Sequence, residues 1–118
     1  MNKTSKYELT IIVPVYNEED NITALEERLS VFLPDAKRTS CVLFVDDGSG
    51  DSSLQRIMDI CRRHTAFFFL SLERNGGLSA ALKAGIDATE SPYVGYMDAD
   101  LQTSPEDFNL LLEYIENY

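Results

Sequence analysis

The sequence predicts an α/β fold with an open, mainly parallel sheet whose strands alternate with helices. Two patterns in the 118-residue chain support this prediction. Four apolar runs of strand length lack a regular alternation of polar and apolar residues, which is typical of strands buried on both faces of a parallel sheet. A segment with apolar residues at helical spacing follows each run, and strands that alternate with helices in this way form parallel sheets with right-handed crossovers.

The first strand is expected at Leu9–Val15. Proline cannot donate to a sheet ladder, so Pro14 should mark the end of this strand. After a polar turn, Asp20 or Asn21 can cap a helix that Pro34 is expected to stop. The apolar face of that helix is expected to consist of Ile22, Leu25, Leu29 and Phe32.

The second strand is expected at Cys41–Val45, before an acidic turn in which Gly48 and Gly50 permit positive φ. Asp51 or Ser52 can cap the helix that follows, so both are expected to be caps rather than site residues. The apolar face of this second helix is expected to consist of Leu54, Ile57, Met58 and Cys61.

The third strand is expected at Ala66–Leu70 and the fourth at Tyr93–Met97. The helix between them, Leu78–Asp87, is rich in small residues and can therefore approach the sheet closely. A last helix is expected to begin where Ser104 provides a cap and Pro105 occupies the first helical position.

Length and composition favour one domain with one real core, and the 44% hydrophobic and 25% charged content is ordinary for a soluble globular protein. The net charge of −10 argues against nucleic acid or an anionic membrane surface as a partner. Cys41 and Cys61 lie in apolar contexts, so we expect buried thiols rather than a disulfide, which fits a reducing cytoplasm. No apolar signal core or run of transmembrane length is present in the sequence.

Polar clusters follow all four predicted strands. In an open α/β sheet, ligands bind beyond the carboxyl ends of the strands. Four separate loops would thus deliver polar groups to one edge, which is the main physical argument for a site. The clusters are Tyr16-Asn17-Glu18, Asp46-Asp47-Gly48-Ser49, Arg74-Asn75-Gly76 and Asp98-Ala99-Asp100.

The last cluster suggests a metal site. If the strand period persists, Asp98 and Asp100 project to the same side, where their mutual repulsion would be relieved by a divalent cation. Mg²⁺ and Mn²⁺ prefer oxygen ligands and commonly combine one or two carboxylates with substrate phosphate oxygens. Gln102 continues the alternation and offers a neutral third oxygen. Taken alone, an Asp-x-Asp pair also fits a solvated loop, where aspartate is common.

The usual phosphate-binding fingerprints are missing, since the first strand is followed by neither a Gly-x-Gly-x-x-Gly segment nor a P-loop lysine motif. Carboxylates in the first loop can instead accept hydrogen bonds from a base or a ribose, and Tyr16 can flank a planar ring. A metal at Asp98 and Asp100 would hold the diphosphate of the same nucleotide. Such an assembly suits a nucleoside-diphosphate donor.

In the same order, these clusters resemble the motifs of family 2 glycosyltransferases, which have the GT-A fold with a Rossmann-like nucleotide-binding half. The resemblance spans nearly the whole chain. Two segments are similar to the dolichyl-phosphate mannose synthase-like branch, which transfers sugars to polyprenyl phosphates. They are Asp98-Ala-Asp-Leu-Gln102, which is followed by Ser-Pro-Glu, and Asn75-Gly-Gly-Leu-Ser-Ala-Ala81. The other matching segments are Val13-Pro-Val-Tyr-Asn-Glu-Glu19, Val45-Asp-Asp-Gly-Ser49 and Arg74-Asn-Gly-Gly77.

The resemblance implies an inverting, metal-dependent enzyme that moves a sugar from a UDP- or GDP-linked donor to an acceptor, for which a polyprenyl phosphate is a candidate. It also implies donor-binding roles in the first two loops. Pro14, Tyr16 and Glu18 would line the nucleoside pocket. Asp46 would accept a hydrogen bond from the base, and Asp47 would sit beside the ribose.

For the last two loops, the resemblance places Arg74 near the base or the diphosphate. Asp98 would contact the ribose or the metal, while Asp100 and Gln102 would hold Mg²⁺ or Mn²⁺ against the diphosphate. Lys83 matches a position where a basic or polar residue is often found, and it carries less weight.

The acceptor-binding half and the catalytic base follow the Asp-x-Asp strand in this family, so no residue is assigned as base. Residues 1–118 are therefore expected to be one nucleotide-sugar-binding domain, the N-terminal part of a longer catalytic domain, without turnover by itself. We expect a cytoplasmic location, with the parent protein at the cytoplasmic face of the membrane, and an exposed sheet edge can favour a homo-oligomer. Gly77 departs from the family pattern, in which Lys or Gln often follows the first glycine.

Three other functions stay open. A sugar nucleotidyltransferase has a similar sheet and metal site, but it usually carries a glycine-rich basic loop where this chain has Tyr16-Asn-Glu-Glu19. A phosphatase with an aspartyl nucleophile would place its Asp-x-Asp strand early in the chain. A non-catalytic nucleotide-binding or assembly module is the third alternative.

Structural roles are expected for several polar and aromatic residues outside these clusters. Glu19 and Asp20 would serve the dipole of the first helix, and His64 would be a surface residue at the end of the second. Tyr93 and Tyr96 are expected to pack in the sheet.

Overall fold

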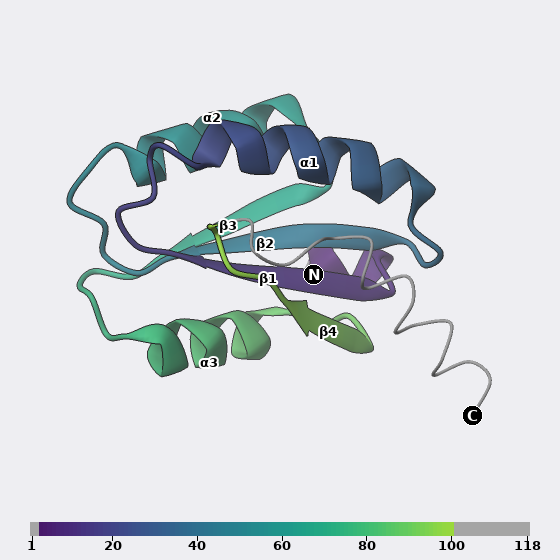
Figure 1. Ribbon diagram of the computed structural model, residues 1–118. Coiled ribbons are helices and arrows are strands. Elements are labelled where there is room, and N and C mark those ends of the chain that lie inside the picture. The colour runs from purple at the N-terminus through teal and green to yellow at the C-terminus, as the bar shows by residue number, and fades with distance from the viewer. Residues whose placement is uncertain (1–2, 101–118) are drawn as a thin grey trace.

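A parallel four-stranded sheet forms the centre of the computed structural model, which describes residues 3–100 (Figure 1). The strands lie in the order β3-β2-β1-β4, and every neighbouring pair is parallel. The predicted open parallel α/β sheet is thereby confirmed. The strands are β1 (Leu9–Val15), β2 (Ser40–Asp46), β3 (Phe67–Ser71) and β4 (Tyr93–Tyr96).

Helices cover both faces of the sheet, because each parallel connection must cross from one end of the sheet to the other. Figure 1 shows α1 (Ile22–Asp35) and α2 (Ser53–Arg63) side by side on one face, and α3 (Leu78–Ala88) on the other. A short 3-10 helix, Lys3–Lys6, precedes β1. The helix expected after Ser104 lies outside the described residues.

The two central strands have apolar cores on both of their faces. Alternate residues such as Ile11 and Val13 belong to the larger core under α1 and α2, whereas Ile12 belongs to the smaller core under α3. At Gly85 of α3, an added Cβ would lie 2.9 Å from Ile12 Cγ2, so only glycine lets the helix approach this closely. The expected close approach of a helix of small residues is therefore confirmed.

The expectation that all four strands are buried on both faces is wrong for β3 and β4. Both are edge strands of the described sheet, paired with a neighbour on one side only. Their alternate residues are partly exposed, including Phe69 at 38%, Val94 at 43% and Tyr96 at 39%. Apolar runs alone do not distinguish a central strand from an edge strand.

Both ends of α1 differ from the expectation. The helix continues through Pro34 to Asp35, because proline fixes a φ that is already helical and removes only one hydrogen bond from the last turn. Asn21 occupies the N-cap position, but its side chain makes no cap bond. Its Nδ2 instead donates to Glu18 Oε2 at 2.7 Å.

The buried face of α2 is rotated from the expected one. The buried residues of this helix are Ser53, Ile57 and Ile60. Leu54, Met58 and Cys61, which were expected on the apolar face, are only partly buried. The helix lies at the side of the sheet that ends in the exposed β3, so its outer apolar residues are less completely covered.

Both cysteines are free thiols, as expected, with Cys41 buried and Cys61 partly buried. Burial raises the pKa of each thiol to about 11. Because the thiolate is the reactive species, both side chains act as small apolar groups at neutral pH.

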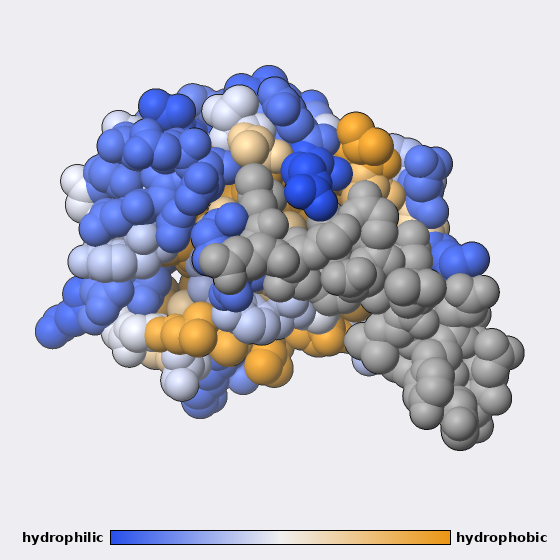
Figure 2. Space-filling model, in the orientation of Figure 1, coloured by the Kyte–Doolittle hydropathy of each residue, from blue (hydrophilic) through white to orange (hydrophobic). Residues whose placement is uncertain are grey.

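The surface is divided by polarity. Figure 2 shows mostly hydrophilic residues over α1 and α2, whereas hydrophobic residues gather on the side of α3. The exposed apolar residues of α3 include Leu78 and Ile86. Among the described helices, none combines the length and the apolar character that a membrane crossing needs.

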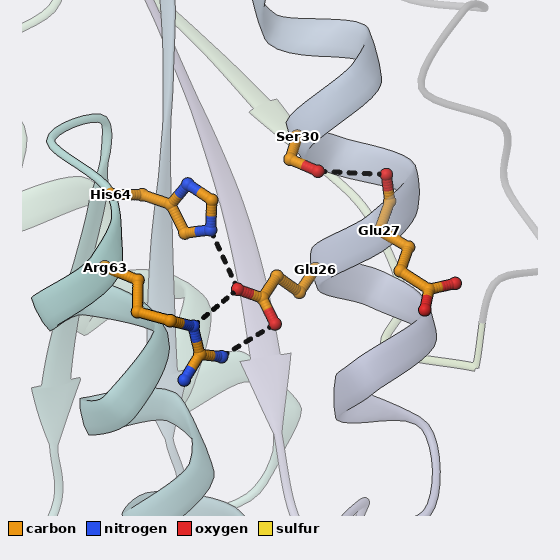
Figure 3. Close-up of polar contacts among 5 residues, drawn as sticks. All are labelled: Glu26, Glu27, Ser30, Arg63 and His64. Atoms are coloured by element: carbon orange, nitrogen blue, oxygen red, sulfur yellow. Dashed lines mark hydrogen bonds and ion pairs between the residues drawn. The ribbon is translucent and has the colours of Figure 1, made fainter.

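A charged cluster ties α1 to the end of α2 (Figure 3). Glu26 of α1 accepts hydrogen bonds from Arg63 Nε at 3.1 Å and Nη2 at 2.7 Å, and its Oε2 lies 2.8 Å from His64 Nε2. His64 is thus a bridging residue, half-buried and with its ring centroid 4.8 Å from that of Phe67, rather than the plain surface residue that was expected. The Arg63 hydrogen bonds lower the pKa of Glu26 despite its partial burial.

Replacing Glu26 should make the free energy of unfolding depend less on pH in the acid range. A lowered pKa means that the carboxylate stabilises the fold above its ordinary value of 4.5, and that this contribution is lost as the pH falls through the lowered folded-state pKa. We expect Glu26→Gln to lower the free energy of unfolding at pH 7 by roughly 1 kcal/mol, and the deficit to disappear in acid. Urea unfolding from pH 7 to pH 3 measures both effects.

Glu27→Gln is the matched control, because this substitution removes the same charge from the same helix at a side chain that is exposed. Within residues 3–100, Glu27 is engaged only through its backbone carbonyl, which accepts from Ser30 Oγ at 3.1 Å (Figure 3). An equal deficit for both variants at pH 7 would show that general charge, not the cluster, is responsible.

Candidate functional site

The loops after all four strands meet around one pocket of about 270 Å³ at the carboxyl edge of the sheet. This is the arrangement that the polar clusters predicted. Six of the predicted site residues line the pocket, and they are Pro14, Tyr16, Glu18, Asp47, Asp98 and Asp100. Asn75, which belongs to the third predicted polar cluster but was given no role of its own, also lines the pocket, as does the apolar Leu78.

A larger hollow of about 630 Å³ lies elsewhere, against β3 and the end of α2. Its lining includes Lys6, Arg62 and Phe68, but it takes no residue from the carboxyl ends of β1, β2 or β4. We therefore take the smaller pocket as the candidate site, because ligands of open α/β sheets bind at the carboxyl ends of the strands.

Asp98 and Asp100 reach the pocket by a different route from the one expected. Strand β4 ends at Tyr96, so the strand period does not persist to the two carboxylates. The segment after the strand turns instead, which buries Ala99 (5% exposed) and leaves the aspartates on both sides of it lining the same pocket. Gln102 lies outside the described residues.

The pair of carboxylates fits a hard divalent cation. Carboxylate oxygens suit Mg²⁺ and Mn²⁺, and Mg²⁺ commonly binds proteins through one or two carboxylates and completes its shell with water and phosphate oxygens. Within residues 3–100, no group of three or more His, Cys, Asp or Glu side chains is placed to hold a metal. The described residues thus supply two carboxylates, and a cation bound there would complete its shell with oxygen atoms from elsewhere.

Asp46 does not line the pocket, although its role as an acceptor for the base stays a prediction. Its side chain is 2% exposed at the end of β2. One oxygen, Oδ2, accepts from the Ser49 backbone N–H at 3.3 Å. The other, Oδ1, is buried and has no hydrogen-bond partner among the described residues. A buried acceptor without a partner is costly, so a donor group brought by a ligand would relieve a penalty there.

Asp47 organises the neighbouring loop. Its Oδ1 accepts from the Gly76 backbone N–H at 2.9 Å, and its Oδ2 accepts from the Gly77 N–H and from Asn75 Nδ2, both at 3.0 Å. The side chain is only 4% exposed. These three donors hold the turn between β3 and α3 against the end of β2. The sequence signal was the pairing of an acidic turn with an Asn-Gly-Gly turn whose N–H groups need acceptors.

Glycines permit this contact between two loops. Gly48 has φ +72°, and an added Cβ would lie 2.5 Å from Arg74 C and from Asn75 N. Gly77 has φ +93°, a conformation that side chains rarely adopt. The departure from the family pattern at Gly77 therefore coincides with a backbone that favours glycine.

The first two loops are also joined to each other. Asn17, in the left-handed region with φ 53°, donates its N–H to Ser49 Oγ at 2.9 Å and accepts from the Gly50 N–H at 2.8 Å through Oδ1. The Glu18 N–H donates to Ser53 Oγ at 2.9 Å. The pocket wall beside Tyr16 and Glu18 is thus anchored on the loop that follows β2.

Asp51 and Ser52 were expected to cap the second helix, and both lie at the start of α2. Ser52 is the N-cap residue without a side-chain cap bond, while Asp51 Oδ1 accepts from the Ser53 N–H at 2.9 Å. Glu19 was expected to serve the dipole of α1, but its carboxylate instead accepts from the Ser52 N–H at 3.1 Å, at the start of α2. Its own N–H donates to Asp51 Oδ2 at 3.3 Å.

Arg74 and Lys83 are not among the lining residues of the pocket. Arg74 is exposed on the loop after β3. Lys83 forms an exposed ion pair with Asp87, in which Nζ lies 2.8 Å from Oδ2. Their predicted roles near a nucleotide stay predictions.

Both Tyr93 and Tyr96 were expected to pack in the sheet. The Tyr93 side chain does pack against the larger core, but the Tyr96 side chain does not. Tyr96 is 39% exposed, and its hydroxyl donates to Asp98 Oδ1. This hydrogen bond to a carboxylate raises the pKa of Tyr96 to about 12, so the hydroxyl stays protonated at neutral pH.

Comparison with known proteins identifies the family. The family model for glycosyl transferase family 2 matches residues 10–118, and the chain belongs to this family. An uncharacterized glycosyltransferase of Synechocystis is 41% identical over 84% of this chain and 31% of its own length. A dodecaprenyl-phosphate galacturonate synthase of Rhizobium johnstonii is 34% identical over 92% of this chain and 32% of its own length.

The fold is that of the GT-A glycosyltransferases. A mannosyltransferase of Pyrobaculum calidifontis, solved in complex with GDP-Man and Mn²⁺, matches with a TM-score of 0.78 at 20% identity. The match covers 97% of this chain and 34% of that one. The chain thus spans about a third of the length of the proteins that it resembles.

A side chain at position 48 should separate the loops that form the pocket. We expect Gly48→Ala to lower the free energy of unfolding by about 3 kcal/mol, because the methyl group adds a clash with the backbone of Arg74 and Asn75 to an unfavourable positive φ. Gly50→Ala is the control in the same loop, since nothing lies within 4 Å of its added Cβ. Urea unfolding compares the two variants, and equal stabilities would contradict the close contact.

Proposed function

We propose that the chain is the donor-binding part of a metal-dependent, inverting glycosyltransferase that uses a nucleoside-diphosphate sugar. The observation that carries this proposal is the charge of the pocket. Four carboxylates line it, and no lysine or arginine does within the described residues. They are Glu18, Asp47, Asp98 and Asp100. A diphosphate entering this pocket would be repelled unless a divalent cation came with it.

The two aspartates after β4 would hold that cation. Asp98 and Asp100 bring two carboxylates to the end of the pocket that β4 supplies, and hard cations bridge such groups to phosphate oxygens. When bound, Mg²⁺ or Mn²⁺ would neutralise the charge that develops on the leaving nucleoside diphosphate. The Mn²⁺ in the mannosyltransferase of the same fold supports this part of the proposal.

The first loop would hold the nucleoside. Tyr16 is 50% exposed at the pocket and offers a ring face to a planar base. The Glu18 backbone is fixed by its bond to Ser53, so its carboxylate is presented from a rigid support. Either a uridine or a guanosine donor fits this arrangement, and the GDP-Man of the structural neighbour shows one such donor in that protein.

We further propose a polyprenyl phosphate as the acceptor of the whole protein. This rests on the motif resemblance and on the name of the Rhizobium relative, which is 34% identical.

An inverting transfer also needs a base that deprotonates the acceptor in line with the leaving group. None of the described residues is assigned this role, so residues 1–118 alone should bind donor without transferring sugar, and sugar transfer by them would contradict this part of the proposal. The parent protein would act at the cytoplasmic face of a membrane.

Calorimetric titration with UDP and GDP, each with Mn²⁺ and with EDTA, tests the donor site. We expect one nucleotide to bind only with Mn²⁺, and Asp100→Asn to weaken that binding at least roughly tenfold, because one of two charged metal ligands is lost. Asp87→Asn is the matched control, since Asp87 is exposed on α3 in an ion pair with Lys83 and outside the pocket.

The other outcomes decide against the proposal. Nucleotide binding that persists in EDTA and in Asp100→Asn would favour a non-catalytic nucleotide-binding module. Equal losses in Asp100→Asn and Asp87→Asn would point to overall charge rather than to a metal ligand. If neither nucleotide binds under any condition, residues 1–118 do not form a donor site by themselves.

A further inference from the structure

Tyr96 stands at the point where the sheet ends and the acidic segment begins. As the last residue of β4, it is paired with Ile12 of the central strand β1. The next residue continues this attachment, because the Met97 N–H donates to the Ile12 carbonyl at 3.0 Å and the Met97 side chain is fully buried. The backbone of Tyr96 is therefore held by the sheet, although its side chain is 39% exposed.

The next carboxylate along the chain has no such support from the backbone. Asp98 follows the end of β4 in a segment without regular secondary structure. Its side chain makes one hydrogen bond within the described part of the chain, accepted by Oδ1 from the Tyr96 hydroxyl. No donor among residues 3–100 reaches the second oxygen, Oδ2, and Asp98 lines the pocket.

We propose that Tyr96 is a positioning residue that fixes the orientation of the Asp98 carboxylate for metal and nucleotide binding. This inference rests on the proposed function of the pocket. A tyrosine has only two side-chain torsions, so a ring anchored on a strand places its hydroxyl at a defined point. A neutral hydroxyl also holds the carboxylate without cancelling the charge that attracts a cation, as lysine or arginine would.

The structure argues against a purely structural role for this hydroxyl. The Tyr96 ring is partly exposed and belongs to neither of the two buried cores. Its hydroxyl bonds to a residue of the pocket rather than to the sheet. Loss of the hydroxyl should therefore change ligand binding much more than stability.

The first test compares Tyr96→Phe with Tyr93→Phe in calorimetric titrations with Mn²⁺ and the nucleotide that binds. Tyr93 lies on the same strand, but its ring packs with its centroid 4.7 Å from the Arg38 guanidinium and does not line the pocket. We expect Tyr96→Phe to weaken binding roughly tenfold, as expected when a hydrogen bond to a charged group is removed, and Tyr93→Phe to bind normally. Unchanged thermal unfolding of Tyr96→Phe separates this effect from a loss of fold.

A double-mutant cycle assigns the effect to Asp98. If Tyr96 acts through this carboxylate, Tyr96→Phe should change the affinity of Asp98→Ala less than twofold, because the group that it orients is already gone. Independent, additive effects of the two substitutions would overturn the proposal. Normal binding by the single Tyr96→Phe variant would overturn it as well.

A ligand-free measurement keeps the inference separate from the proposed function. The χ1 torsion of Asp98, measured by NMR scalar couplings, should occupy one rotamer in the wild type and in Tyr93→Phe, and become averaged in Tyr96→Phe. Identical couplings in all three proteins would overturn the positioning role. A fixed rotamer in a wild type that binds no nucleotide would instead contradict the function of the pocket while leaving the contact between Tyr96 and Asp98 in place.

Discussion

The carboxylate of Asp47 is the contact on which the geometry of the pocket depends. It accepts from the N–H groups of Gly76 and Gly77 and from the Asn75 side chain, which ties the start of α3 to the end of β2. Several donors that converge on one buried carboxylate fix the two segments relative to each other. Gly48 leaves the space that this contact needs, because a side chain there would meet Arg74 and Asn75. Asp47 and Gly48 therefore set the distance between the loop after β2 and the loop after β3.

The pocket combines two kinds of acidic group. The Asp47 oxygens accept hydrogen bonds from protein donors, whereas Asp98 and Asp100 line the pocket on the segment that follows β4. This division follows from position, since Asp47 is 4% exposed and Asp100 is exposed. An aspartate in this pocket can therefore hold two loops together or be exposed to a ligand, and the residue type alone does not decide which.

Sequence patterns were sufficient to predict the parallel sheet, the order of strands and helices along the chain, and the meeting of four loops at one edge of the sheet. Continuous apolar runs located β1 and β2, and the rule for carboxyl ends placed four loops at one pocket. The sequence patterns did not reveal that Asp47 binds a turn, because its partners lie about 30 residues away and two of the three are backbone N–H groups. They also failed for Tyr96, since an edge strand and a central strand can have the same apolar composition.

The two cores differ greatly in size, and this difference has a consequence for local unfolding. Among residues 3–100, the core under α1 and α2 contains fifteen buried residues, whereas the one under α3 contains four. Segments with few buried contacts open at lower free energy than the rest of a domain. Gly77 and Leu78 at the start of α3 line the pocket. A ligand that binds there therefore also stabilises α3 against local unfolding. Amide hydrogen exchange of α3, the helix over the smaller core, should therefore slow when a ligand occupies the pocket.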